Sequence, residues 1–521
     1  MKLKTLGGLA TAATLALAGL TACGGDSGDA ATSVVVGTLS DPGSLDPQLS
    51  VVSALFEISG YAYDTLVGLT PDGDVVPQVA ESWTYDGTTA VFTLHDDVTC
   101  SDGSTLSAQT VADNFTWVED LNNASPYLGV FVPAGLTATA DAAANTVTLT
   151  LAAPAPFLLE SIANFPLVCA AGLADRSLLA AGTVGSGPYE LTEAVPDDHY
   201  TYTLRDGYTW GPDGATSDGL PQTLTLRIVG SESTGVNLLL TGEVNVMTTT
   251  GADGDRAEAA GLAGIDVPAL LGETWYNHAE GHPTADAGVR QALTEALDLA
   301  QLATVVTGGT GGPATMMAVV PPTTCSYDSI TAALPAYSAA AAGATLEQAG
   351  YAMGADGVYA KDGQPLTLKF LYDSNLGTAG QAAAELAIQQ WTAAGIAIDA
   401  QELDTTRLSE VLFGTGDWDI AWEPINIGSP DQLVGFLSGP ALADGGANFS
   451  SIANSAYDAA VANALAAVGD AACAGFATAE TALFDNYDLV AWAVRPNKIY
   501  LNGVTLAYTG KTQVTSLRVT G

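Results

Sequence analysis

The feature of this sequence that most constrains its fold is a change of pattern near residue 280. Before it, short apolar stretches alternate with turns rich in Gly, Asp and Pro, which is typical of β-strands. After it, segments with strand periodicity alternate with helical stripes, which indicates an α/β arrangement. The sequence therefore predicts a strand-rich first half and an α/β second half, with a return to strands over 498–521.

Individual elements follow from the same periodicities. A helix is predicted over 286–300, because its apolar residues recur at helical spacing. Helices are also predicted over 339–349 and 379–394, each followed by a glycine that suits a helix end, and Asp404 or Thr405 is expected to cap a helix that reaches Phe413. The predicted strands are 34–38, 91–95, 146–151, 201–204, 223–228, 366–370, 396–398 and 418–422.

The N-terminus has the pattern of an export signal. Lys2 and Lys4 precede an apolar stretch over 6–20 that is too short to span a bilayer comfortably. Residues 20–23, Leu-Thr-Ala-Cys, resemble a bacterial lipobox, which implies cleavage after residue 22 and lipidation of Cys23. An ordinary secretory signal with an incidental cysteine is the alternative. We expect 1–22 to be a lipoprotein signal peptide and 23–33 a flexible tether, with the protein anchored to the outer face of the bacterial cytoplasmic membrane.

Charge excludes several classes of partner. The chain has 14 Lys and Arg against 57 Asp and Glu, a net charge of −43. So few cations make it a poor ligand for nucleic acid, and anionic membrane surfaces should repel it. The acids are not unusually abundant, so we interpret the charge mainly as a solubility effect, with steering of cationic ligands as the alternative.

No motif for catalysis or for a cofactor is found in the sequence. It lacks a phosphate-binding loop, the paired histidines of metalloproteases and a nucleophile elbow. His278 and His282 have a spacing that could hold a metal on a helix, but Gly281 and Pro283 argue against a helix there. We therefore predict no enzyme activity, no metal and no cofactor.

Four cysteines remain besides Cys23. They are Cys100, Cys169, Cys325 and Cys473, and four cysteines allow three pairings. An exported location permits disulfides, while four reduced, buried thiols are the alternative.

Four segments carry a resemblance to a known family. The most specific, residues 76–111, reads VPQVAESWTYDGTTAVFTLHDDVTCSDGSTLSAQTV. The others are Ser-Leu-Asp-Pro at 44–47 followed by Tyr-Asp-Thr-Leu-Val at 63–67, Val-Gly-Ser-Gly-Pro-Tyr at 184–189, and Asp286 with Val-Arg-Gln-Ala-Leu at 289–293. Together they resemble the family 5 extracellular solute-binding proteins, the peptide- and nickel-type receptors of ABC importers, over essentially the whole mature chain.

Most of these motif residues are expected to maintain the fold. Gly185 and Gly187 permit a tight chain crossing, and Arg290 is expected to tie a loop by an ion pair.

The resemblance implies an α/β, two-lobed, periplasmic-binding-protein-like clamp of type II, in its large cluster C form, with an extra β-rich subdomain in lobe I. Lobe I would combine a discontinuous base (34–58, 183–277 and 494–521) with an inserted subdomain (59–182), and lobe II would be 278–493. Each lobe then holds two of the cysteines. This favours the pairs Cys100–Cys169 and Cys325–Cys473.

The chain departs from the family at its expected ligand site. Peptide receptors of this family carry an aspartate that pairs with the ligand's α-ammonium, a few residues after a tryptophan and four before a proline. Counted from Trp422 this position is Ile425, and counted from Pro430 it is Asn426. Glu423 or Asp431 could take the role only if the loop is shifted.

Other cleft residues are expected from their positions in the family. Aromatic side chains in a cleft can stack on sugars or line apolar pockets, while core packing is the alternative for each tryptophan. The candidate ligand-binding residues are Val52, Ser53, Phe56, Trp275, Tyr276, Asn277, Trp422, Glu423 and Asn426.

The function that the resemblance implies is that of a substrate-binding lipoprotein. It would capture a peptide or peptide-like solute between its lobes and deliver it to an ABC permease served by a separate ATPase. An oligosaccharide receptor, a non-transport sensory lipoprotein and a secreted hydrolase on the same scaffold are the alternatives. We expect a monomer that contacts the membrane only through its lipid.

Overall fold

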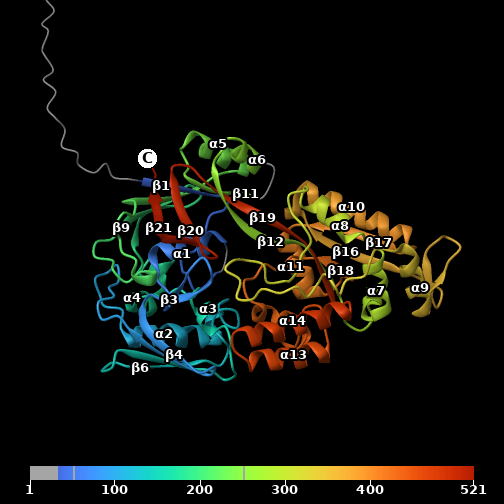
Figure 1. The fold of residues 1–521 in the computed structure, drawn as a ribbon, viewed down its shortest axis with the longest axis horizontal. Coiled ribbons are helices and arrows are strands. Elements are labelled where there is room, and N and C mark those ends of the chain that lie inside the picture. The colour runs from blue at the N-terminus through green and yellow to red at the C-terminus, as the bar shows by residue number, and fades with distance from the viewer. Residues whose placement is uncertain (1–32, 51–52, 250–252, 521) are drawn as a thin grey trace, which may run out of the picture.

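The computed structural model describes residues 33–50, 53–249 and 253–520. Figure 1 shows two bodies joined by two long neighbouring strands, β12 (Ala263–Tyr276) and β19 (Leu489–Leu501). The first body holds the elements from β1 to α6 together with β20 and β21, and the second holds those from α7 to α14. Cys23, with the predicted signal peptide and nearly all of the predicted tether, lies outside the described residues.

One mixed sheet of ten strands runs through both bodies. β12 and β19 pair antiparallel along almost their whole length, β16 pairs parallel with β17 and β18, and β1 pairs parallel with β10. From edge to edge the strands are β17 (Ala397–Leu403), β16 (Thr367–Asp373), β18 (Ile420–Trp422), β12, β19, β11 (Val246–Thr249), β1 (Ser33–Thr38), β10 (Thr223–Ile228), β9 (His199–Leu204) and β8 (Tyr189–Val195).

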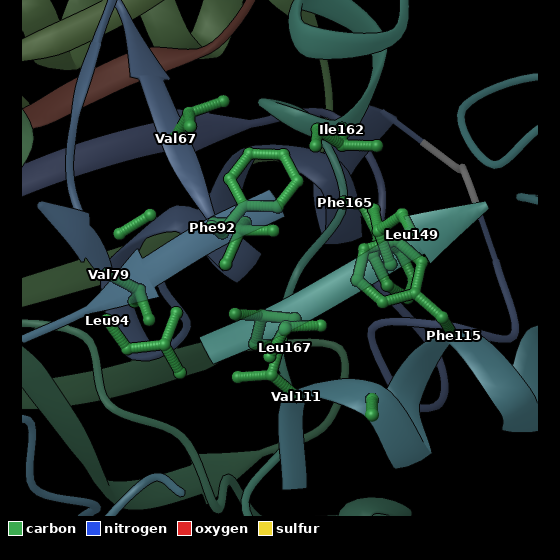
Figure 2. Packing of buried hydrophobic residues seen from close by; sticks show 14 of the residues in the cluster. Val67, Val79, Phe92, Leu94, Val111, Phe115, Leu149, Ile162, Phe165 and Leu167 are labelled. Atoms are coloured by element: carbon green, nitrogen blue, oxygen red, sulfur yellow. The ribbon is translucent and has the colours of Figure 1, made fainter. Parts of the chain in front are cut away.

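The first body also contains a separate four-stranded sheet covered by α2 (Ala108–Glu119). In β5 alternate residues are buried, and Phe92 and Leu94 belong to one apolar cluster with Val111 and Phe115 of α2 (Figure 2). The sheet consists of β4 (Ala80–Tyr85), β5 (Thr89–Leu94), β7 (Thr146–Thr150) and β6 (Thr137–Asp141).

Smaller elements complete the two bodies. The short sheets are β2 (Val67–Leu69) with β3 (Val75–Pro77), β13 (Ala352–Met353) with β14 (Tyr359–Lys361) and β15 (Gln364–Pro365), and β20 (Val504–Tyr508) with β21 (Thr512–Val519). The remaining α-helices are α1 (Ser53–Ala62), α3 (Leu158–Ile162), α4 (Ala170–Ala174), α5 (Glu232–Thr241), α6 (Asp253–Ala259), α7 (Ala287–Glu295), α8 (Leu299–Val306), α9 (Ala339–Gln348), α10 (Gly377–Ala393), α11 (Thr405–Glu410), α12 (Val434–Leu437), α13 (Ser455–Leu465) and α14 (Asp470–Asp485). No described helix combines the length and the apolar character that crossing a membrane requires.

Two helix predictions need correction. The stripe over 286–300 is divided between α7 and α8, because the Asp298 side chain accepts the backbone N–H of Gln301 and starts a new helix. The helix after Asp404 is capped as expected, with its carboxylate accepting the N–H of Arg407. It does not continue regularly to Phe413, because a π-helical turn follows at Val411–Thr415.

The family motifs have the structural roles expected of them. A Cβ on Gly185 would lie 2.2 Å from the carbonyl oxygen of Ala62, so only glycine allows the chains to cross there. The buried Arg290 guanidinium lies 3.3 Å from the Asp488 carboxylate and also donates to the carbonyl of Tyr487, which ties α7 to the start of β19.

Each body contains one disulfide. Cys100–Cys169 has a Cα–Cα distance of 6.2 Å and Cys325–Cys473 one of 5.4 Å. This is the pairing that the family resemblance implied.

Candidate ligand-binding cavity

A cavity of about 340 Å³ lies between the two bodies. The first body contributes Phe56 of α1, Phe131 and Glu160 of α3, which we call the first wall. The second body contributes 320–324 and 426–429, which we call the second wall, and the turn at 509–510 closes one side. Close by, the bodies touch through Phe157 and Phe476, whose ring centroids are 5.8 Å apart. A ligand in this cavity would therefore contact both bodies at once.

The first wall is mainly aromatic. The rings of Phe56 and Phe131 are stacked, with centroids 5.9 Å apart and planes inclined by 20°. Lys511 lies beside them, its Nζ 5.5 Å from the Phe56 centroid, and burial lowers the pKa of this lysine to about 8 despite the negative charge of Glu57. Stacked rings of this kind offer a flat apolar face to a ligand.

Glu160 is the charged member of the first wall. It is half-buried on the short helix α3, and burial raises the pKa of its carboxyl group. The nearby negative charge of Asp431 raises this pKa further. Removing a carboxyl group from water disfavours its ionised form, so a cation beside Glu160 would stabilise the carboxylate.

The second wall is held in place by hydrogen bonds to β12. Asn426 accepts the N–H of Leu270 at 2.7 Å through Oδ1, and its Nδ2 donates to the carbonyl of the same residue at 3.3 Å. The N–H of Ile425 donates to Glu273 Oε2 at 2.7 Å. The loop that contains Ile425 and Asn426 is thus fixed to β12, one of the strands that join the bodies.

The same wall ends in a short 3₁₀-helix, Pro430–Leu433, that begins with a capping box. The Ser429 side chain accepts the backbone N–H of Gln432, and the Gln432 side chain accepts the backbone N–H of Ser429. Pro430 occupies the first helical position. Asp431 follows, accepting a hydrogen bond from the Ser429 hydroxyl, and burial raises the pKa of its carboxyl group.

Two of the predicted ligand-binding residues, Phe56 and Asn426, line this cavity. Asn426 uses both polar atoms of its amide on Leu270. Ser53 is the first residue of α1, and Val52 lies outside the described residues.

Four other predicted residues lie in the packed interior. Trp275, Tyr276, Asn277 and Trp422 are at most 2% exposed and do not belong to the cavity lining. Trp275 packs on Phe449 with centroids 4.7 Å apart, and the Asn277 amide donates to main-chain carbonyls. The reason is their position: the end of β12 and the adjoining β18 are buried on both faces, so neither alternating face reaches the cavity.

Glu423 lies outside this lining as well. It is half-buried, and burial together with the negative charge of Asp373 raises its pKa to about 7. Its carbonyl accepts the indole N–H of Trp275 at 2.9 Å. This residue therefore helps to hold the loop.

Sequence reasoning missed Phe131, Glu160 and the segment 320–324. Glu160 resembles any glutamate on a short helix, and no sequence motif surrounds Phe131. The segment 320–324 had one weak signal, since its Pro-Pro pair lies shortly before Cys325.

The two histidines with metal-like spacing are not brought together. His278 lies 3.0 Å from the carbonyl of Asp488, and His282 pairs with Asp419 at 2.9 Å. Among the residues that the structure describes, no group of three or more His, Cys, Asp or Glu side chains is arranged to hold a metal ion.

Comparisons with known proteins assign this chain to a family. The profile of the bacterial extracellular solute-binding proteins, family 5 (Middle), matches residues 74–440. The chain belongs to this family, whose members are non-enzymatic, extracytoplasmic substrate-binding components of ABC transporters with an α/β periplasmic-binding-protein fold.

Two curated relatives illustrate the range of the family. The dipeptide-binding protein of Escherichia coli is 26% identical over 452 residues, covering 78% of this chain and 79% of that protein. The nickel-binding periplasmic protein of the same organism is 28% identical over 344 residues, covering 63% of each. The second match spans less than two thirds of the relative.

Solved structures share the fold over nearly the whole chain. A substrate-binding protein from Microbacterium hydrocarbonoxydans, complexed with 4-hydroxybenzoate hydrazide, gives a TM-score of 0.75 at 28% identity, covering 94% of this chain and 100% of that one. The oligopeptide-binding protein AppA of Bacillus subtilis, complexed with a nonapeptide, gives 0.72 at 18% identity, covering 94% and 99%.

Proposed function

We propose that this chain is a lipid-anchored receptor that captures a small peptide-like solute and delivers it to the permease of an ABC importer. The observation that carries the proposal is the cavity of about 340 Å³, whose walls come from both bodies. A ligand bound there stabilises the arrangement in which the bodies are close together, and that arrangement is what a permease can recognise.

The division of the chain into lobes is part of this proposal. The base of lobe I would comprise 34–58, 183–277 and 494–521, the inserted subdomain 59–182, and lobe II 278–493. Lobe II would begin just after the end of β12 and would end within β19. Bending of these two strands would open and close the cavity.

The size of the cavity and the relatives support a small, peptide-like ligand. One of the Escherichia coli relatives is a dipeptide-binding protein, and the protein from Microbacterium hydrocarbonoxydans was crystallised with an aromatic hydrazide. An oligosaccharide is favoured less, because Trp275 and Trp422, the rings proposed to stack on sugars, are buried away from the cavity. Phe56 and Phe131 would supply the apolar contact instead.

The lipid anchor is proposed from residues 20–23 alone. Conversion of Cys23 to serine should release the protein from membranes into the medium or into the soluble exported fraction. Metabolic labelling with a fatty acid should mark the wild-type protein and leave the Cys23→Ser variant unmarked. A labelled variant would contradict the assignment of this cysteine.

The receptor function is tested by binding and uptake together. The mature chain without its lipid is screened by thermal shift against dipeptides, peptide amides, aromatic hydrazides and cello-oligosaccharides. A ligand at ~100 times its dissociation constant adds ~2.7 kcal/mol to the unfolding free energy. Cells lacking the gene should then fail to import the solute that binds. Binding of sugars only, or uptake unchanged by the deletion, would contradict the proposal.

A further inference from the structure

Resting on the proposed function, we infer that the cavity selects solutes with an apolar body and a protonated amine, and that the Glu160 carboxylate pairs with this amine. Glu160 belongs to the first wall, whereas Asn426 and its loop belong to the second wall.

The charge of the described cavity lining comes from one residue. Of the described residues that line the cavity, Glu160 is the only charged one, and it forms no ion pair with any residue that the structure describes. A second carboxylate, Asp431, is close enough to disfavour its ionisation. A cation that enters the cavity would therefore find an uncompensated negative site, and its binding would stabilise the ionised carboxylate.

The Asn426 side chain already forms hydrogen bonds within the protein. Its Oδ1 accepts the N–H of Leu270 and its Nδ2 donates to the carbonyl of Leu270. An amine that approached Asn426 would have to share Oδ1 with the N–H of Leu270, and a neutral amide oxygen holds an ammonium more weakly than a carboxylate does. The second wall thus offers a fixed surface, and the cation is left to Glu160.

The other lining residues indicate the chemical character of the rest of the ligand. The stacked rings of Phe56 and Phe131 and the prolines at 321 and 322 favour an apolar body. The Thr324 hydroxyl oxygen is buried at the second wall without a hydrogen-bond partner in the described chain, so it is a candidate for one polar contact. A free dipeptide also carries a carboxylate, for which the described lining residues provide no cation. Lys511, outside the lining, has Glu57 beside it.

The test uses three matched probes: phenylalanyl-leucine amide, which is a cation, its N-acetyl derivative, which is neutral, and the free dipeptide, which is a zwitterion. Titration calorimetry on the mature wild-type chain should give the tightest binding for the amide. The Glu160→Gln variant should lose tenfold or more of its affinity for the amide and keep its affinity for the N-acetyl derivative. Glu160→Asp, which keeps the charge, should retain the preference for the amide.

Glu81→Gln is the matched control, because Glu81 is an exposed glutamate on β4 in the same body and does not line the cavity. This variant should bind every probe as the wild type does. Retained binding of the N-acetyl derivative, together with an unchanged circular dichroism spectrum, shows that Glu160→Gln is folded.

Three results would overturn the inference: an unchanged affinity of Glu160→Gln for the amide, equal wild-type affinity for the amide and the N-acetyl derivative, or no binding of any probe by the wild type. The proposed receptor function is judged separately, by the uptake experiment. Uptake of a neutral solute that depends on this protein would refute the cation preference and leave the receptor function intact.

Discussion

The two walls of the cavity are built in different ways. In the second wall the polar groups of the loop are already used: Asn426 binds Leu270, and the N–H of Ile425 binds Glu273. In the first wall two aromatic rings pack on each other, and Glu160 forms no ion pair with a described residue. The difference teaches that the loop of the second wall is positioned by the protein itself, whereas the charged group of the first wall is left for a ligand. Four predictions test this comparison.

The largest expected effect comes from the disulfides. Replacing either pair by serines should lower the unfolding free energy by ~2–5 kcal/mol, because the unfolded chain is no longer restrained.

The two variants should differ in binding. Cys325 directly follows Thr324 of the second wall, so the Cys325→Ser/Cys473→Ser variant should also lose ligand affinity. The Cys100→Ser/Cys169→Ser variant should keep it, because that disulfide lies in the core of the first body. Denaturant unfolding and calorimetry measure the two effects. Equal losses of affinity would show that the walls do not differ in this respect.

The next prediction concerns the support of the second wall. Glu273 is fully buried, burial raises its pKa to about 8, and its Oε1 has no hydrogen-bond partner among the described residues. Between pH ~4.3 and the folded-state pKa, the unfolded chain releases this proton while the folded chain keeps it, so stability falls as pH rises.

The Glu273→Gln variant does not ionise and can still accept the N–H of Ile425. It should be more stable than the wild type by a few kcal/mol at pH 8, with the difference disappearing near pH 4. Unfolding curves across this pH range measure the effect. A constant difference at all pH values would mean that ionisation of Glu273 does not limit the stability of this wall.

A smaller effect is expected from Asn426. The Asn426→Ala variant leaves the N–H and carbonyl of Leu270 without their side-chain partner and should lower stability by ~1–3 kcal/mol. The Asn426→Asp variant should also be destabilised, because a carboxylate oxygen would then face the carbonyl of Leu270. We expect no gain in amine affinity from this aspartate. Chemical unfolding and titration with phenylalanyl-leucine amide test both points, and tighter amine binding by Asn426→Asp would assign recognition to the second wall.

The smallest effect is expected from the aromatic pair. Phe131→Ala removes the ring stacked on Phe56 and should reduce the affinity for a ligand with an aromatic body by ~0.5–1.5 kcal/mol, at most about tenfold. Phe131→Leu, which keeps an apolar side chain, should lose less. Calorimetry with the N-acetyl probe isolates this contribution from that of Glu160. An unchanged affinity in Phe131→Ala would show that the first wall does not recognise the ligand through its rings.

Much of the fold was predictable from local pattern. The strand at residues 223–228 and the helix begun by Asp404 were recognised because periodicity and capping are properties of neighbouring residues. The interruption between α7 and α8 was missed, because the apolar stripe continues across it and only the Asp298 cap marks the break. Gly185 and Arg290 were correctly assigned structural roles, since such roles follow from the backbone or charge of one residue.

The cavity was predictable only in part. Phe56 and Asn426, predicted from their positions in the family, line the cavity, whereas Trp275 and Trp422 lie in the core, which was the alternative stated for each tryptophan. Sequence gives the face of a strand on which a side chain lies, but the burial of both faces of β12 depends on what covers them.

The sequence by itself determined the strand-rich and α/β halves, the family, and the absence of known catalytic motifs, because each of these is written in residues close together along the chain. Only the tertiary structure decided that Glu160 and Asn426, 266 positions apart by number, line one cavity. The physical reason is that β12 and β19 hold the two bodies against each other. Residues that become neighbours in this way are far apart along the chain, so local periodicity does not reveal them. The sequence around a glutamate on a short helix does not indicate whether its side chain faces water or a ligand.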